Sequence, residues 1–95
     1  MFSAQATIET VKASRYLKAL CNHFNRKVTA EYDDNHGLVQ FGFGTCEMVA
    51  EAGSLIIRVQ SSDGEDFARV KSVVASHLER FSGDEKLPVS WIETC

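Results

Sequence analysis

The stretch that decides the fold is SRYLKALCNHFNRK, residues 14–27. At about 3.6 residues per turn, its apolar residues fall on one stripe of a helix. These residues are Tyr16, Leu17, Leu20, Cys21 and Phe24. We therefore expect an amphipathic helix over Ser14–Lys27, capped at its start by the Ser14 side chain. The apolar stripe needs a surface to cover, and a sheet is the simplest one.

Segments of alternating polarity lie on both sides of this helix and predict strands. The first strand is expected over Phe2–Val11, with Phe2, Ala4, Ala6 and Ile8 on its inner face. Four more are expected at Lys27–Tyr32, Leu38–Phe43, Cys46–Glu51 and Leu55–Gln60. The connectors, Asp33–Gly37, Gly44-Thr45 and Ala52–Ser54, have turn composition and are short enough to join antiparallel neighbours. The four strands therefore form a predicted meander.

One face of the predicted meander is apolar. Its residues are Val28, Ala30, Tyr32, Val39, Phe41, Phe43, Cys46, Met48, Ala50, Leu55, Ile57 and Val59. This pattern is typical of an antiparallel sheet with one face in the core and the other in water.

A second amphipathic helix is expected over Ser62–Ser82, where Ser62 and Glu65 have the spacing of a capping box. Its apolar stripe is Phe67, Val70, Val74, Leu78 and Phe81, and Gly83 should end it. A last strand is expected over Leu87–Thr94, with Pro88 indicating a sheet edge. The predicted fold is a single α+β domain over residues 1–95. Its order is β-α-β-β-β-β-α-β, and both helices pack on one face of an antiparallel sheet.

Net charge, apolar runs and cysteine count indicate which partners and which cellular compartment to expect. The net charge is −3 and the sequence pI is near 5.5, so no basic footprint for nucleic acid is present. No signal peptide or long apolar run occurs, and the odd set of Cys21, Cys46 and Cys95 favours a reducing compartment. We expect a cytoplasmic protein that contacts neither nucleic acid nor membrane.

Two histidines and two cysteines are the candidates for chemistry. Cys21 and His23 are two residues apart and diverge by about 200° on a helix, which opposes a shared metal site. His77 suits a general acid or base, or a ligand-binding group, but a boundary histidine bonded to backbone or to Glu79 is the favoured interpretation. A distributed metal site of His23, His77 and Cys46 would need the helices side by side. No motif identifies a cofactor.

Three segments, followed by Trp91, carry a family resemblance: RYLKALCNHF at 15–24, GTC at 44–46 and SHLERF at 76–81. They resemble the motifs of the bacterial family of domain of unknown function 2218. The resemblance implies a small single-domain bacterial protein. It also implies a link to iron handling, since the domain is associated in some genomes with siderophore-interacting flavin reductases. Family members often have a second histidine three residues after the first, where this chain has Arg26.

The leading functional hypothesis is a non-enzymatic accessory or binding module, linked by the resemblance to iron or siderophore metabolism. A small anionic ligand is expected. The polar groups predicted to meet it are Arg15, His23, His77 and Arg80.

Two other classes stay open. One is a small enzyme that uses His77 as general acid or base, together with Cys46 or Glu79. The other is a homodimeric interaction protein. Its interface would use the apolar residues that strand parity leaves on the outer face of the sheet: Val11, Leu38, Val49, Ile56 and Ile92.

Overall fold

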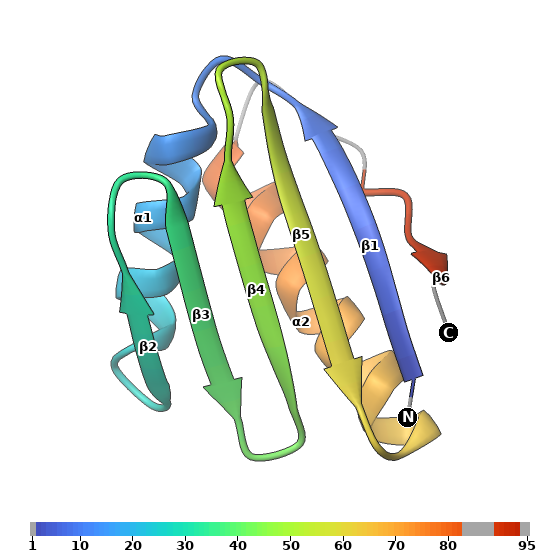
Figure 1. The fold of residues 1–95 in the computed structure, drawn as a ribbon. Helices are drawn as coiled ribbons and strands as arrows, with labels where there is room; N and C mark the ends of the chain where they lie inside the picture. Colours follow the sequence, from blue (N-terminus) through green and yellow to red (C-terminus); the bar gives the residue numbers. More distant parts are fainter. Residues whose placement is uncertain (1, 83–88, 94–95) are drawn as a thin grey trace.

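The described residues form six strands and two helices, in the order expected from the sequence. The computed structural model describes residues 2–82 and 89–93. The elements are β1 (Phe2–Glu9), α1 (Ala13–Phe24), β2 (Thr29–Tyr32), β3 (His36–Phe41), β4 (Gly44–Ala50), β5 (Ser54–Ser61), α2 (Gly64–Ser82) and β6 (Ile92–Glu93). Both helices lie on one face of an antiparallel sheet (Figure 1). The predicted α+β fold is confirmed.

The sheet has the strand order β2-β3-β4-β5-β1-β6. The predicted meander forms its first four strands, and β1 returns from the start of the chain to pair with β5. This pairing runs in unbroken register from Phe2 opposite Ser61 to Glu9 opposite Ser54. The last strand, β6, adds a short edge beside β1. It is much shorter than the predicted Leu87–Thr94, whose residues 87, 88 and 94 lie outside the described residues.

The inner face of the sheet forms the core with the two helix stripes. Its fully enclosed side chains include Ile8, Val39, Met48, Leu55, Ile57 and Val59. Two residues assigned to this face differ from the prediction, because Phe2 is 44% exposed and Tyr32 is 40% exposed. Phe2 begins β1 and Tyr32 ends the short edge strand β2, so each has fewer neighbours than a central residue.

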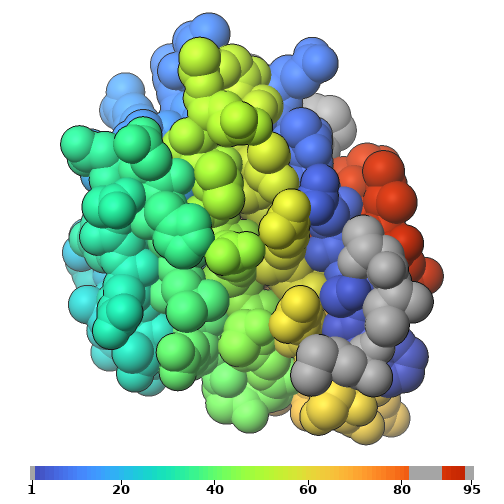
Figure 2. Space-filling view, in the orientation of Figure 1, coloured from blue at the N-terminus to red at the C-terminus, as the bar shows by residue number. Residues whose placement is uncertain are grey.

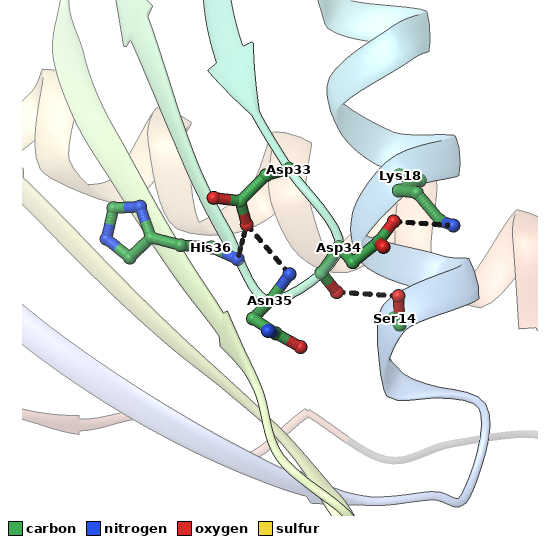
Figure 3. A network of polar contacts seen from close by, with 6 residues as sticks. All are labelled: Ser14, Lys18, Asp33, Asp34, Asn35 and His36. Atoms are coloured by element: carbon green, nitrogen blue, oxygen red, sulfur yellow. Dashed lines mark hydrogen bonds and ion pairs between the residues drawn. The ribbon is translucent and has the colours of Figure 1, made fainter.

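The turn before β3 ends earlier than the sequence predicts, and the turn after β3 begins earlier. The carboxylate of Asp33 accepts hydrogen bonds from the backbone N–H groups of Asn35 and His36, both at 2.8 Å (Figure 3). These bonds close the turn within three residues and let β3 begin at His36. They also lower the pKa of the Asp33 carboxyl. At the other end of β3 the turn is Gly42-Phe43, so Phe43 lies in the turn and Gly44 begins β4.

The first helix begins and ends differently from the prediction. Ser14 does not cap α1, because Lys12 occupies the cap position. The Ser14 hydroxyl instead donates to the backbone carbonyl of Asp34 at 2.6 Å, which ties α1 to the β2–β3 turn (Figure 3). The helix ends at Phe24 rather than at Lys27, and the Asn25 side chain accepts from the N–H of Ala30 at 3.2 Å. Arg26 and Lys27 therefore lie in a turn.

The cap of the second helix is Asp63, not Ser62. The Asp63 carboxylate accepts hydrogen bonds from the N–H groups of Glu65 and Asp66, both at 3.1 Å. An aspartate placed here satisfies two of the unpaired N–H groups of the first turn. The predicted stripe is confirmed, with Phe67, Val70, Val74 and Leu78 buried and Phe81 partly buried against the core. The predicted stop at Gly83 lies outside the described residues.

The outer face of the sheet is crossed by polar contacts. Glu47 on β4 pairs with His36 at 3.0 Å and with Arg58 at 3.7 Å, and Arg58 donates to the Gln5 side chain at 2.8 Å. Figure 2 views the molecule from this uncovered side, where β3, β4 and β5 lie side by side. The contacts join four strands on the face predicted to be wet.

The apolar residues predicted for this outer face differ in their exposure to solvent. Leu38, Val49 and Ile56 are half-buried on the central strands, and Ile92 on β6 is 70% exposed. Val11 does not belong to the face, because β1 ends at Glu9 and Val11 lies in the following turn, 86% exposed. Neither described helix is long and apolar enough to cross a membrane.

Gly37 on β3 lies where α1 comes closest to the sheet. A Cβ atom at this position would lie 2.7 Å from the Cys21 sulfur and 3.2 Å from a Leu17 methyl carbon. Cys21 and Leu17 are fully buried on the α1 stripe. Any larger residue at position 37 would therefore push α1 away from β3.

We expect Gly37→Ala to lower the free energy of unfolding by about 1–3 kcal/mol, because the added methyl overlaps the Cys21 sulfur. Urea unfolding would measure the change. Gly53→Ala is the control, since a Cβ there meets no atom within 4 Å and should cost less than about 0.5 kcal/mol. The double variant Gly37→Ala/Cys21→Ala should lose less free energy of unfolding than the two single variants together, because the overlap with the sulfur is gone. Equal costs for the two glycine variants would contradict this account.

Replacing the α2 cap, Asp63→Ala, should destabilise the protein by about 1 kcal/mol, because two N–H groups lose their acceptor. Ser62→Ala serves as the matched control and should stay within about 0.5 kcal/mol of the parent. Thermal and urea unfolding of both variants would give the comparison. A larger loss for Ser62→Ala would instead support the capping box expected from the sequence.

Candidate functional site

A cavity of about 440 Å³ opens between the C-terminal end of α1, the middle of α2 and the β3–β4 turn. We call it the histidine cavity. Its lining residues are His23, Phe24, Arg26, Lys27, Val28, Phe41, Phe43, Arg69, Val73 and His77. The volume falls within the range of about 300–1,000 Å³ that is common for small-molecule sites.

Helix packing brings the two histidines together. His23 lies in the last turn of α1 and His77 lies on α2, at the edges of the stripes that pack on the sheet. Because α1 and α2 contact each other on the same face, the centroids of the two imidazole rings are 4.8 Å apart. Phe24 and Phe81 flank the pair, with centroids 5.8 and 5.6 Å from that of His23. Both rings are half-buried.

The proton arrangement of His77 follows from its hydrogen bond to the backbone. Its Nδ1 lies 2.7 Å from the carbonyl oxygen of Val73, one helical turn earlier. A carbonyl can only accept, so Nδ1 donates this bond and carries a proton. The favoured interpretation of His77, a histidine bonded to backbone, is confirmed for this nitrogen. Nε2 is then the ring nitrogen that can meet a ligand.

His23 lies among positive groups. Partial burial lowers the pKa of its imidazole, and charges on His77, Arg26, Arg80 and Lys27 lower it further. These cations come from the turn after α1 and from α2, so two elements contribute to the effect. The neutral form of His23 is therefore favoured in the empty cavity. A bound anion would reverse the effect by offsetting the positive charge.

Aromatic rings form one wall of the cavity. Phe41 and Phe43 are stacked, with ring centroids 5.2 Å apart and planes inclined by 23°. Phe24 meets Phe41 edge to face at 5.1 Å, and the Arg69 guanidinium lies 4.2 Å from the centroid of Phe43. The early turn at Gly42-Phe43 places the Phe43 ring in this wall.

The cavity and its border have cationic groups with no ion-pair partner in the described part of the chain. Within residues 2–82 and 89–93, none of Arg26, Lys27, Arg69 or Arg80 forms an ion pair, and no carboxylate lines the cavity. By contrast, Lys18 is paired with Asp34 elsewhere on the surface. A chain with a net charge of −3 therefore has a locally positive cavity. This combination favours an anion.

The structure separates the four predicted ligand-binding residues. His23 and His77 line the histidine cavity, while Arg80 borders a smaller hollow of about 250 Å³ together with Ser76 and His77, and His77 is common to both hollows. Arg15 is exposed on α1 and lines neither hollow.

Sequence analysis did not identify Arg69, Phe41 and Phe43 as site residues. One signal was present, because Arg69, Val73 and His77 recur at intervals of four and so share one face of α2. Arg26 and Lys27 fall at the end of the helix expected over Ser14–Lys27, and the structure places them in the turn beside the cavity.

Of the three residues considered for a metal site, His23 and His77 lie together, but Cys46 does not join them. Cys46 is fully buried on β4 and does not line the cavity, and burial raises its pKa. Burial also raises the pKa of Cys21 to about 11. No cluster of three or more metal-ligating side chains occurs among the described residues. Glu79, the other proposed partner of His77, is exposed on α2.

Comparison with known proteins places the chain in a family. The family model described as "Uncharacterized protein conserved in bacteria (DUF2218)" matches residues 5–92. The chain belongs to the DUF2218 family. The NMR structure of PA4090 from Pseudomonas aeruginosa is similar, with a TM-score of 0.82 and 32% identity, over 97% of this chain and 96% of that one. No curated protein matches significantly. The DUF2218 match includes every residue that lines the histidine cavity.

Arg26→Gln should raise the pKa of His23, because it removes one of the positive charges that lower it. The pKa is read from the imidazole proton shifts in an NMR titration. Arg15→Gln is the matched control, since Arg15 is not among the charges that act on His23. An unchanged His23 pKa in Arg26→Gln would show that the turn after α1 lies farther from the ring.

Proposed function

We propose that this DUF2218 protein is a binding module for a small anionic ligand, held in the histidine cavity. The observation that supports the proposal is a set of cations with no ion-pair partner among the described residues, around a cavity that no described carboxylate lines. Such a set of like charges repels itself when empty, and an anion relieves the repulsion. The link to iron or siderophore metabolism, which the family resemblance implies, concerns the physiological setting and is a separate proposal.

Each cationic group has a distinct part in this proposal. His77, fixed by its bond to Val73, donates from Nε2 to the anion in its doubly protonated imidazolium form, which the bound anion stabilises, and His23 adds a second imidazole beside it. Arg69 offers a planar guanidinium that can donate two parallel hydrogen bonds to an acidic group. Arg26 and Lys27 attract the anion from the mouth of the cavity.

The proposal predicts that charge decides which small molecules bind. Benzoate and benzylammonium have similar size and opposite charge, so benzoate should shift the backbone amide NMR signals around the cavity and benzylammonium should not. His77→Ala should weaken benzoate binding by about tenfold, because one hydrogen bond to a charged group is lost.

Arg15→Gln provides the matched control, because Arg15 is a cation of α1 outside the cavity, and it should leave benzoate affinity unchanged. Circular dichroism and thermal unfolding would establish that each variant is folded. Equal shifts with benzoate and benzylammonium, or none with benzoate, would contradict the proposal.

A further inference from the structure

The histidine cavity has two chemically different sides. Its cations come from α2 and from the turn after α1, whereas its aromatic wall comes from Phe24, Phe41 and Phe43. A ligand that was only an anion, such as an inorganic ion, would leave this wall in contact with water. A ligand with an apolar body and one acidic group would cover both sides.

The geometry of the wall favours a flat ring over a saturated one. Phe41 and Phe43 are only half-buried, although they stack on each other. The two imidazoles add further ring surfaces, with His77 5.0 Å and His23 5.8 Å from Phe24 by ring centroid. A ligand ring entering here would meet ring edges and faces, which attract an aromatic partner beyond simple burial.

Arg69 adds a second reason. Its guanidinium lies over the Phe43 ring at 4.2 Å, so a planar cation and an aromatic face already share this part of the cavity. A guanidinium can stack on an aromatic ring while its N–H groups bond an acidic group in the same plane. An acidic group attached directly to an aromatic ring places the hydrogen-bond acceptor and the ring one bond apart, so one ligand can use both interactions.

We infer that the ligand class of the histidine cavity is an aromatic acid, in which a flat ring carries the acidic group. This inference rests on the proposed function and specifies its ligand. The ring packs against Phe41 and Phe43, and the acidic group meets Arg69 and the two histidines. Together, these aromatic contacts strengthen binding by about two- to tenfold over an aliphatic group of the same size.

A pair of acids separates ring recognition from charge recognition. Benzoate and cyclohexanecarboxylate have the same charge and similar size, and the saturated ring is the more hydrophobic. If burial of apolar surface alone decided the affinity, cyclohexanecarboxylate would bind at least as tightly as benzoate. We expect benzoate to bind the full chain about two- to tenfold more tightly, measured by NMR titration or calorimetry.

Variants assign the preference to particular side chains. Phe43→Leu should remove most of the preference for benzoate, because it removes one of the two rings against which the ligand ring packs and keeps an apolar side chain. Phe2→Leu is the control for loss of an aromatic ring, since Phe2 stacks on Phe67 outside the cavity. Lys27→Gln removes charge alone, so it should weaken both acids in the same proportion.

The outcomes distinguish this inference from the function on which it rests. Equal affinities for the two acids would overturn the aromatic ligand class and leave anion binding intact. Binding of neither acid would overturn both. A preference for benzoate that persists undiminished in folded Phe43→Leu would overturn the assignment of the aromatic wall as the source of selectivity.

Discussion

The close approach of α1 to the sheet at Gly37 is the constraint on which the rest of the arrangement depends. Cys21 and Leu17 occupy the space that any other side chain at position 37 would need. The helix therefore sits low over β3, where the Ser14 hydroxyl and Lys18 reach Asp34 in the β2–β3 turn. A core packed this tightly fixes the helix in both translation and rotation. The position of the last turn of α1, which carries His23, follows from this contact.

That position creates the histidine cavity. Because α1 lies beside α2 on the same face, His23 meets His77 at the helix–helix boundary. Because α1 ends at Phe24, the chain turns over the end of β3 and carries Arg26 and Lys27 to the cavity. The early β3–β4 turn supplies the opposite wall. Within α2, the lining residues Arg69, Val73 and His77 follow one another at about one helical turn. Each element therefore contributes a short segment, and a small domain can build the cavity from three such segments.

The electrostatics of the molecule are unevenly distributed. On the outer face of the sheet, Glu47 contacts the His36 imidazole and the Arg58 guanidinium, and the charges of Glu47 and Arg58 offset each other. In the histidine cavity the positive groups have no such partner among the described residues, and burial together with these charges lowers the pKa of His23. Uncompensated charge of one sign opposes folding slightly and favours a counter-charged ligand. This contrast is the physical basis of the anion-binding proposal.

The sequence by itself determined the elements, their order, the core stripes and the family. The apolar periods of 2 residues in strands and 3.6 residues in helices depend only on neighbouring residues, so they can be recognised in the sequence alone. Only the tertiary structure decided that β1 pairs with β5, that His23 lies 4.8 Å from His77, and that Arg69 and Phe43 share a cavity wall. Distances between segments far apart in the chain depend on packing. The true caps, such as Asp63, depend on which of several adjacent polar residues reaches the N–H groups.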